Sequence, residues 1–533
     1  MILTLLFTAA LAYVIWSLAC LESNVRKARA IGVPVVRLPI DVHNIPWTTL
    51  QPLSSGPSST AFPSDTHLRL GPAWALVTPM AIHLQFADPD AIRDMFARRE
   101  DFVRPIKDYK VLEIYGPCIS TAGWDDWARH RKPLAAPFNE RIMTFVWEES
   151  LKQAGAMLRS WTGDSAAVAG IPSVQKDTRT LSLNVLAATG FHKSYDFHGS
   201  ADGPVVDDEA GSYRDALQTV LDNSILLILV PFRYLGAPIM PKSWAKVGRA
   251  ARVFKKYMEQ MLQDETATRD QGKPGSGGIM TSFVYALAEH DLNPEAQNAK
   301  VSKSGKKGLS VDEIYSNLFV INFAGHHRQH SGLFHDLPVG EWDYKTRFPE
   351  LKRCRAVLLE TLRLHPPIMA LPKWTLKKAQ TLTVGGQALV IPPGISTNPY
   401  LIAIQTHPKY WRDPRYFTSL IDPYAWQPSR WISNPAASPD AMAEEKVVVP
   451  LKGTYFPWSD GPQNCPGKKF AEVEAVAVLA CLFKTHRLLA KKDAGESDES
   501  ARKRALACAN NVDMEMLLRM VDAGRTRLIC KEA

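Results

Sequence analysis

Residues 456–471 read FPWSDGPQNCPGKKFA, the most informative stretch of the chain. It holds one cysteine, Cys465, with Gly461 four residues before it and Gly467 two residues after it. Glycine adopts positive φ angles without strain and lets the backbone approach a flat group closely. Backbone N–H groups in such a turn can point at a sulfur atom and stabilise a thiolate. The pattern predicts an iron-ligand loop built on Cys465, and the alternative is a small buried cysteine in a Gly/Pro turn.

Two stretches upstream of the cysteine loop contain a glutamate and two arginines. Residues 360–367 read ETLRLHPP, so Glu360 and Arg363 share one face of a helix and can pair there. The two prolines that follow end that helix. Residues 426–431 read WQPSRW and supply a second arginine, Arg430. The planar guanidinium fork suits a carboxylate bidentately. Taken alone, a Glu/Arg pair at this spacing is usually a solvated helix surface.

A fourth motif lies near the first quarter of the chain. Residues 127–131 read WARHR, which places Trp127 and Arg131 on the same face of a helix. The four motifs, in their order along the chain, resemble those of the cytochrome P450 family over roughly residues 30–525. The resemblance implies a P450 fold that is mainly α with small β-sheets (α+β). It also implies that Cys465 is the proximal ligand of a haem b, a thiolate that favours cleavage of the O–O bond.

The resemblance also assigns roles to further residues. Glu360, Arg363 and Arg430 form the structural triad behind the cysteine loop. Lys373 sits where an arginine often reaches a haem propionate, and it keeps the charge but loses the fork. Gln463 stands where many relatives have a basic residue, and Trp458 replaces a phenylalanine beside the haem. The cofactor contacts implied are Trp127, His130, Arg131, Lys373, Trp458, Gly461, Cys465 and Gly467.

The central helix of the family is incomplete in this sequence. Residues 310–313 form a capping box, which opens an apolar helix over 314–323. By resemblance Ala324 and Gly325 line the oxygen side and belong, with Cys465, to the catalytic residues. An acid and a threonine are expected next, but residues 327–340 read HRQHSGLFHDLPVG, which lacks helical periodicity and contains a helix-breaking proline.

We therefore expect a truncated central helix. The sequence of residues 327–340 favours the hypothesis of a reading-frame error or a mis-called intron. A permitted back-translation of residues 327–338, read one nucleotide later, gives TANTLAFSMTY, an apolar segment with a threonine. The stretch from Ala324 to Glu360 is also shorter than in the family. A metal cluster of His327, His330 and His335 is the weaker reading of the same segment.

The first residues predict a membrane anchor. Residues 1–21 contain an uncharged apolar run of about 20 residues, the length that spans a bilayer. Arg26, Lys27 and Arg29 follow, which predicts a single-pass protein of the endoplasmic reticulum membrane with its catalytic domain facing the cytoplasm. A cleaved signal peptide is the alternative. Residues 22–46 are expected to be a basic, proline-rich hinge, and residues 47–533 the catalytic domain.

Composition and charge limit the kinds of compartment and partner that we expect for this protein. The 533 residues are 46% hydrophobic and 22% charged, which suits a large globular core. Seven scattered cysteines fit a reducing compartment rather than a disulfide framework. The net charge of +9 is spread along the chain without a nucleic-acid module. Lys132, Lys468 and Lys469 are either ordinary surface lysines or a basic face for an acidic electron donor.

The sequence therefore predicts a membrane-anchored haem-thiolate monooxygenase. No flavin or nicotinamide fingerprint is present, so electrons from NADPH are expected through a separate NADPH–cytochrome P450 reductase. The substrate is expected to be a small, largely apolar metabolite of fungal secondary metabolism, contacted by residues 107–123, 213–235 and 368–371. The alternatives are a haem-thiolate isomerase, dehydratase or peroxide-using enzyme, and an inactive product of a mis-predicted gene model.

Overall fold

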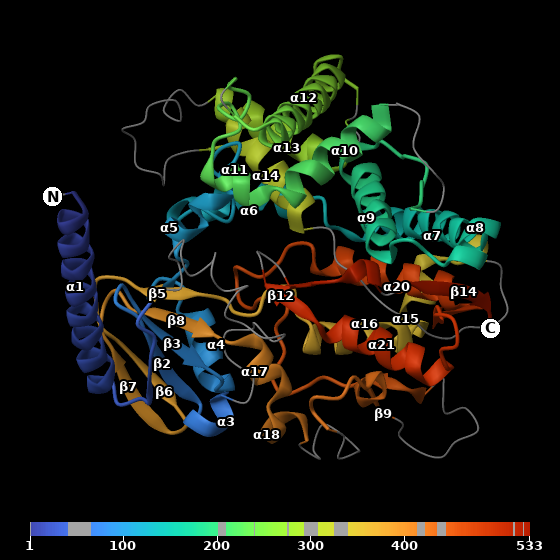
Figure 1. Ribbon diagram of the computed structural model, residues 1–533. Helices are drawn as coiled ribbons and strands as arrows, with labels where there is room; N and C mark the ends of the chain where they lie inside the picture. The colour runs from blue at the N-terminus through green and yellow to red at the C-terminus, as the bar shows by residue number, and fades with distance from the viewer. Residues whose placement is uncertain are drawn as a thin grey trace. The chain divides into compact units, whose positions relative to one another are not determined.

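The computed structural model describes residues 2–40, 66–200, 209–292, 307–324, 339–412, 422–433 and 444–533, apart from residues 239, 274, 276, 515–517 and 526. Helices dominate, and the strands are short (Figure 1). The predicted fold class, mainly α with small β-sheets, is confirmed. The chain folds as two compact units, of which the first combines Met1–Pro105, Leu359–Cys465 and Ala507–Asp522 and the second takes the remaining residues.

A six-stranded sheet forms the centre of the first unit. Its strands, in spatial order, are β1 (Val35–Arg37), β2 (Ala73–Val77), β3 (Ile82–Phe86), β8 (Ser396–Pro399), β5 (Lys373–Thr375) and β4 (Phe102–Val103). Every residue of β2 is buried, as expected for a strand covered on both faces. The sheet presents β4 and β5, and therefore Lys373, at one edge.

The other elements of the first unit surround this sheet. They are α1 (Ile2–Ala30), α3 (Thr66–Leu70), α4 (Pro89–Ala97), β6 (Gln380–Val384), β7 (Gln387–Ile391), α17 (Leu401–Thr406), α18 (Pro408–Trp411), η5 (Pro428–Trp431), β9 (Ile432–Ser433), β10 (Lys446–Val447), β12 (Val512–Met514) and β13 (Leu518–Met520). Helix α4 begins with a strong cap, because the Asp88 carboxylate accepts from two backbone N–H groups of the first turn.

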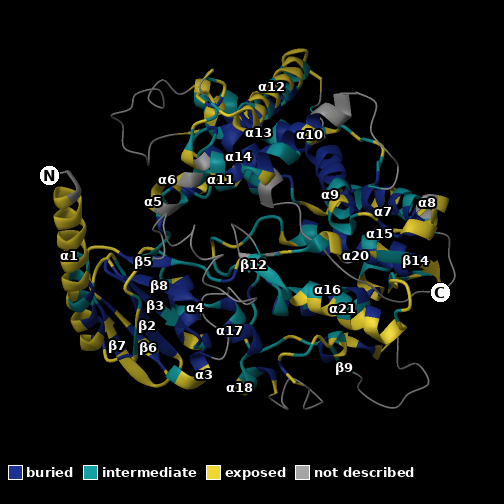
Figure 2. Cartoon of the chain, viewed as in Figure 1, coloured by how far each residue is buried: buried dark blue, intermediate teal, exposed yellow. Residues whose placement is uncertain are grey.

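Helix α1 covers the expected anchor and continues into residues that the sequence assigns to the hinge. Its first part exposes large apolar side chains, and by length and composition it could cross a membrane (Figure 2). Its second part continues through residues 22–30 of the expected hinge, where Val25 and Ala28 are fully buried. The Asn24 amide donates to the carbonyl oxygens of Thr78 and Pro79, each at 3.1 Å. Packing and these bonds extend the helix, because tertiary contacts outweigh the weak local signal.

The second unit is almost entirely helical. Its helices are α5 (Ile106–Tyr109), η1 (Lys110–Leu112), α6 (Trp124–Ala135), α7 (Glu140–Thr162), α8 (Asp164–Ala169), α9 (Val174–Phe191), α10 (Glu209–Asp222), α11 (Ser224–Leu229), α12 (Lys242–Asp270), α13 (Ile279–Asp291), α14 (Val311–Ala324), η4 (Val339–Glu341), α15 (Tyr344–Glu350), α20 (Lys468–Phe483) and η6 (Ala523–Arg525). The antiparallel pair β11 (His486–Ala490) and β14 (Leu528–Glu532) completes it. Helices α16 (Lys352–Leu364) and α21 (Asp498–Asn510) each contribute to both units.

Helix α20, which follows the cysteine loop, is the buried spine of the second unit. Most of its residues are buried, Glu472 and Glu474 among them, and it packs along α7 (Figure 2). A helix that is buried over most of its surface is held in place by the elements that cover it. This burial fixes the helix that begins three residues after Cys465.

Helix α14 begins as the sequence predicts. The Ser310 backbone N–H donates to Glu313 Oε2 at 2.9 Å, and the Glu313 N–H donates to Ser310 Oγ at 3.4 Å, so both bonds of the capping box are present. The helix runs to Ala324. Residues 325–338 lie outside the described residues. Gly325, the three histidines and the reading-frame hypothesis therefore stay predictions.

Candidate active site

The predicted triad meets inside the first unit. Arg363 holds Glu360 with two bonds, Nε to Oε2 at 2.7 Å and Nη2 to Oε1 at 2.8 Å. Arg430, from η5, donates through Nε to Glu360 Oε1 at 3.1 Å. All three residues are buried. Two further donors, the Trp431 indole N–H and the Gln427 backbone N–H, each bond the same carboxylate at 2.9 Å.

This cluster ties three separate segments of the first unit together. Burial by itself would raise the pKa of the Glu360 carboxyl, but the bonds and charges of Arg363 and Arg430 lower it below its ordinary value. Arg363 also donates to the carbonyl oxygens of Gln405 and Pro423, at 2.9 and 2.6 Å. Removing one member of such a buried set leaves an uncompensated charge, at a cost of about 3–5 kcal/mol.

The cysteine loop is a tight turn with a defined backbone. The Cys465 N–H donates to the Trp458 carbonyl oxygen at 2.8 Å, and the Asn464 N–H donates to that of Gly461 at 3.2 Å. Ser459 and Gly461 both have left-handed backbones, with φ of 64° and 68°. At Gly461 a Cβ atom would lie 3.0 Å from the Phe96 carbonyl oxygen, so a side chain there is strained for two reasons.

The two flanking glycines therefore differ. Gly467 has φ of −82° and precedes α20 as its N-cap residue, so the positive φ expected at both positions occurs only at Gly461. Cys465 itself is partly exposed. Trp458 packs edge-on against Tyr455, with ring centroids 6.4 Å apart.

Two cations converge on Gln463, two residues before Cys465. Lys373 Nζ lies 3.3 Å from Gln463 Oε1, and Arg104 Nη2 donates to the Gln463 carbonyl oxygen at 3.0 Å. Lys373 is only 5% exposed. Burial and the nearby charge of Arg104 lower its pKa to about 8. Within the part of the chain that the structure describes, no carboxylate lies within 4 Å of the Lys373 ammonium group.

Burying a charge is costly unless it is paired, so a buried ammonium group beside a second cation favours the binding of an anion there. The chemistry of this donor set fits an acidic edge of a cofactor held next to the cysteine loop. Sequence reasoning found Lys373 but missed Arg104, because Arg104 follows a strand of two residues and belongs to no periodic pattern. Its place at the end of β4, next to β5, was the only available signal.

In the second unit, α6 carries Trp127 and Arg131 on one face. The Arg131 guanidinium carbon lies 5.7 Å from the centroid of the Trp127 ring, and Trp124 stacks on Trp127 with centroids 5.4 Å apart. The i and i+4 spacing thus brings the pair together as predicted. The side chain of Ala324 is not among the described parts of α14.

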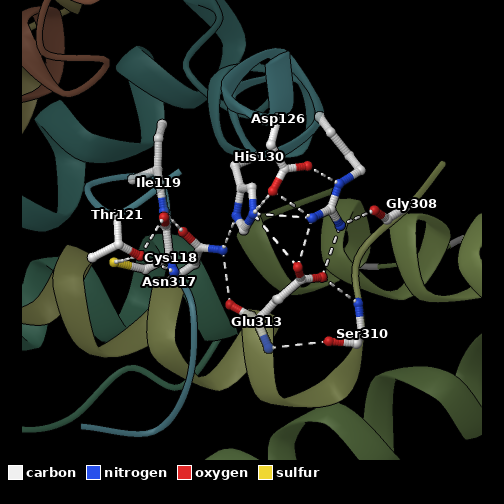
Figure 3. A network of polar contacts seen from close by, with 10 residues as sticks. Cys118, Ile119, Thr121, Asp126, His130, Gly308, Ser310, Glu313 and Asn317 are labelled. Carbon is white, nitrogen blue, oxygen red and sulfur yellow. Dashed lines mark hydrogen bonds and ion pairs between the residues drawn. The ribbon is translucent and has the colours of Figure 1, made fainter. Parts of the chain in front are cut away.

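His130, one turn along α6, lies in a different environment. It is fully buried, and its Nδ1 lies 3.0 Å from the Asn317 amide nitrogen. Its Nε2 faces Asp126 Oδ2 at 3.5 Å and Glu313 Oε1 at 3.6 Å (Figure 3). Protein groups therefore occupy both ring nitrogens. The role of His130 as a cofactor contact stays a prediction, and the contacts of both ring nitrogens favour a structural role.

Asp126, His130 and Glu313 lie close enough to hold a metal ion, but Arg129 takes that place. Its Nε bonds Asp126 Oδ1 at 2.6 Å, and its Nη1 and Nη2 bond the two Glu313 oxygens at 2.7 and 2.6 Å. Burial would raise the pKa of both carboxyls, but contacts with His130 and Arg129 lower the pKa of Asp126, and the bonds from Arg129 lower that of Glu313. The cluster is therefore a closed ion-pair network between α6 and α14. Sequence reasoning missed it because the Arg129–Glu313 pair spans 184 residues.

Comparison with known proteins identifies the family. The family model for cytochrome P450 matches residues 45–335 and 345–511. The chain belongs to the cytochrome P450 family. The match breaks off over residues 336–344, next to the segment in which the sequence departs from the family pattern.

Similar proteins extend this result. A cytochrome P450 monooxygenase of Arthrobotrys oligospora is 26% identical, with 96% of this chain and 95% of that protein covered. The phomenoic acid biosynthesis cluster cytochrome P450 monooxygenase of Leptosphaeria maculans is 25% identical over 91% of this chain and 92% of that protein. The crystal structure of the cytochrome P450DA heme domain has a TM-score of 0.60 at 16% identity and covers 94% of this chain and 97% of that one.

These findings make this P450 an oxidoreductase of the monooxygenase type, with a haem whose iron is bound by a thiolate. The residues present fit that cofactor, because the first unit offers a cysteine in a tight loop and, beside it, the buried Lys373 and the half-buried Arg104. P450 monooxygenases act on small molecules and receive electrons from redox partners. The apolar helix α1 is compatible with attachment to a membrane.

Proposed function

We propose that Cys465 is the thiolate ligand of a haem b and that the enzyme oxidises a small, largely apolar metabolite. The observation that carries this proposal is the buried Lys373 ammonium group, which lies with the half-buried Arg104 on the residue two before Cys465. When bound, the haem supplies the oxygen-activating chemistry. The protein's part is to hold the thiolate in a fixed turn and to neutralise the acidic edge of the cofactor.

Further residues complete the proposed site. Lys373 and Arg104 are the proposed propionate contacts beside the cysteine loop, and Trp127 and Arg131 are proposed as propionate contacts from the family motif alone. Trp458 and Gly461 shape the cysteine loop, and Gly467 starts the helix behind it. Glu360, Arg363 and Arg430 hold that loop's surroundings rigid. Ala324 and Gly325 line the oxygen side.

The electron donor and location follow from the same reasoning. We propose NADPH–cytochrome P450 reductase as the donor, because the sequence carries no flavin or nicotinamide fingerprint of its own. Helix α1 anchors the protein in the endoplasmic reticulum membrane, and the basic residues after its apolar run keep residues 47–533 on the cytoplasmic side. The name of the Leptosphaeria maculans relative supports a role in fungal secondary metabolism.

The test is the spectrum of the reduced protein with carbon monoxide. The full chain is loaded with hemin, reduced and exposed to the gas, and the Cys465→Ala variant is treated in the same way. We expect the thiolate-type Soret band in the parent and its loss in the variant. Cys508→Ala is the matched control, since the Cys508 thiol bonds the Asp522 carbonyl oxygen and lies in no predicted motif. A thiolate-type band in Cys465→Ala refutes the proposed ligand.

A second function is favoured by one feature of the sequence. No acid and threonine follow Ala324 and Gly325, the pair expected to relay protons during oxygen activation. A haem-thiolate isomerase, dehydratase or peroxide-using enzyme does not need that relay. Turnover of an organic hydroperoxide without NADPH or reductase supports this second function, and turnover that requires both supports the first.

A further inference from the structure

The loop of residues 113–122, which joins η1 to α6, is packed closely on α14. Gly116 has φ of 143°, and a Cβ atom there would lie 2.9 Å from the Asp312 carbonyl oxygen in the first turn of α14. The Tyr115 hydroxyl donates to the Ala251 carbonyl oxygen of α12 at 3.1 Å. The ring centroid of Tyr115 lies 5.8 Å from that of Phe319, also on α14. The loop therefore lies against α14 at backbone distance.

Asn317 joins this loop to the helices. Its Oδ1 accepts from the Ile119 backbone N–H at 2.8 Å, and its Nδ2 donates to the Glu313 carbonyl oxygen at 2.8 Å (Figure 3). Its Nδ2 also lies 3.0 Å from His130 Nδ1. Only an oxygen can accept from the Ile119 N–H, so the orientation of the amide is fixed. Nδ1 of His130 then accepts, and its Nε2–H faces the two carboxylates.

The amide thus links three segments. The loop is held through Ile119, α14 carries Asn317 itself, and α6 is reached through His130. On the far side of His130, the guanidinium of Arg129 fixes α6 to α14 with bonds of 2.6–2.7 Å. Asn317 is fully buried, so its bonds are not exchanged for bonds to water at little cost. Loss of the amide leaves the Ile119 N–H and the His130 ring without these partners.

We propose that Asn317 is a positioning residue that fastens the loop of residues 113–122 to α14 and α6. The loop is then a fixed wall rather than a gate that opens freely. Helix α6 also carries Trp127 and Arg131, so the same amide sets the loop relative to that pair. The attachment stands on the contacts alone. Its consequence for ligand entry rests on the proposed function, because it takes the loop as part of the substrate side.

Hydrogen exchange of the full chain tests the attachment without any cofactor. Asn317→Leu keeps the approximate volume and removes the acceptor and both donors. We expect peptides that contain Ile119 to exchange about tenfold faster, the factor for loss of one buried hydrogen bond. Gly116→Ala disturbs a different contact of the same loop and should accelerate the exchange of the same peptides. Asn184→Leu is the matched control, since Asn184 is an equally buried amide on α9 that bonds Gln153.

Two exchange results overturn the proposal. Unchanged exchange of residues 113–122 in Asn317→Leu shows that the loop is held by other contacts. Faster exchange spread over the whole second unit, as Asn184→Leu would produce, shows that Asn317 is an ordinary core residue. Should Asn317→Leu fail to fold, Asn317→Ala, which removes the same amide, is measured instead: acceleration confined to the loop supports the attachment, and no acceleration refutes it.

Ligand entry is measured on haem-loaded protein by stopped-flow spectroscopy. The probes are imidazole and the bulkier 4-phenylimidazole. We expect Asn317→Leu to raise the association and dissociation rates of 4-phenylimidazole several-fold while those of imidazole change little. Equal rates in parent and variant refute the wall. If the parent takes up no haem, the proposed function fails while the exchange experiment still decides the attachment.

Discussion

Removing the charge of Lys373 should raise the stability of the apoprotein and lower its affinity for hemin. The ammonium group of Lys373 is buried beside Arg104, and its pKa falls from 10.5 to about 8 in the apoprotein. The folded pKa is below the unfolded one, so the unfolded chain binds more protons between pH 8 and 10.5. Stability of the apoprotein should therefore rise with pH across that window. Below pH 8 the buried charge should cost about 3 kcal/mol.

The change to make is Lys373→Met, which keeps the length of the side chain and removes the charge. At pH 7 we expect the apoprotein of this variant to be more stable than the parent, up to the same ~3 kcal/mol. We expect its affinity for hemin to be lower, because the propionate loses a buried cation. A surface lysine in the same region, Lys377, supplies the matched control, and Lys377→Met should change neither quantity.

The pH dependence separates charge pairing from packing. Hemin affinity is measured by quenching of tryptophan fluorescence at pH 7, 8 and 9 for parent and variant. In the parent apoprotein the protonated fraction of Lys373 falls from about nine-tenths at pH 7 to about one-tenth at pH 9. The ratio of the parent's affinity to that of the variant should therefore drop about tenfold over this range. A ratio that stays flat refutes the pairing of Lys373 with an acidic group of the cofactor.

Three further results are expected. Glu360→Leu leaves two buried guanidinium groups without their carboxylate and should lower the free energy of unfolding by about 3–5 kcal/mol in urea titrations. The control Glu350→Leu breaks only the exposed Glu350–Arg347 pair and should lower it by less than about 1 kcal/mol. Equal losses in the two variants would contradict the role of the triad. Gly461→Ala should cost more stability and hemin retention than Gly495→Ala, because both have positive φ but only Gly461 has a carbonyl within 3.0 Å of the added Cβ; equal effects would refute the contact. The transcript over codons 320–345 should show a frame shift or retained intron, and expressed RNA with one open frame for residues 327–340 would refute that hypothesis.

Local patterns in the sequence were sufficient to predict the Glu360–Arg363 pair and the capping box. Glu360 and Arg363 are three residues apart on one helix, so their pairing follows from helix geometry. The reciprocal bonds of Ser310 and Glu313 follow from a four-residue motif for the same reason. Arg430 was placed only by resemblance to the family, because no local rule brings a residue 67 positions beyond Arg363 to the same carboxylate.

Long-range geometry accounts for what the sequence did not predict. Arg104 reaches Gln463 across 359 positions, and its role depends on which strand lies beside β4. His130 shares a motif with Trp127 and Arg131. It precedes Arg131 by one residue, so its side chain lies about 100° around the helix from that of Arg131 and faces Asn317. Tertiary neighbours decided both cases, and spacing along the chain does not encode them.

The central claim is that sulfur from Cys465 binds the haem iron. The most direct measurement is the carbon monoxide spectrum of the reduced full chain, compared between parent and Cys465→Ala at equal haem content. We expect a thiolate-type Soret band that only the parent shows. The same band in both proteins, or a parent that folds and binds hemin but never shows the band, would contradict it.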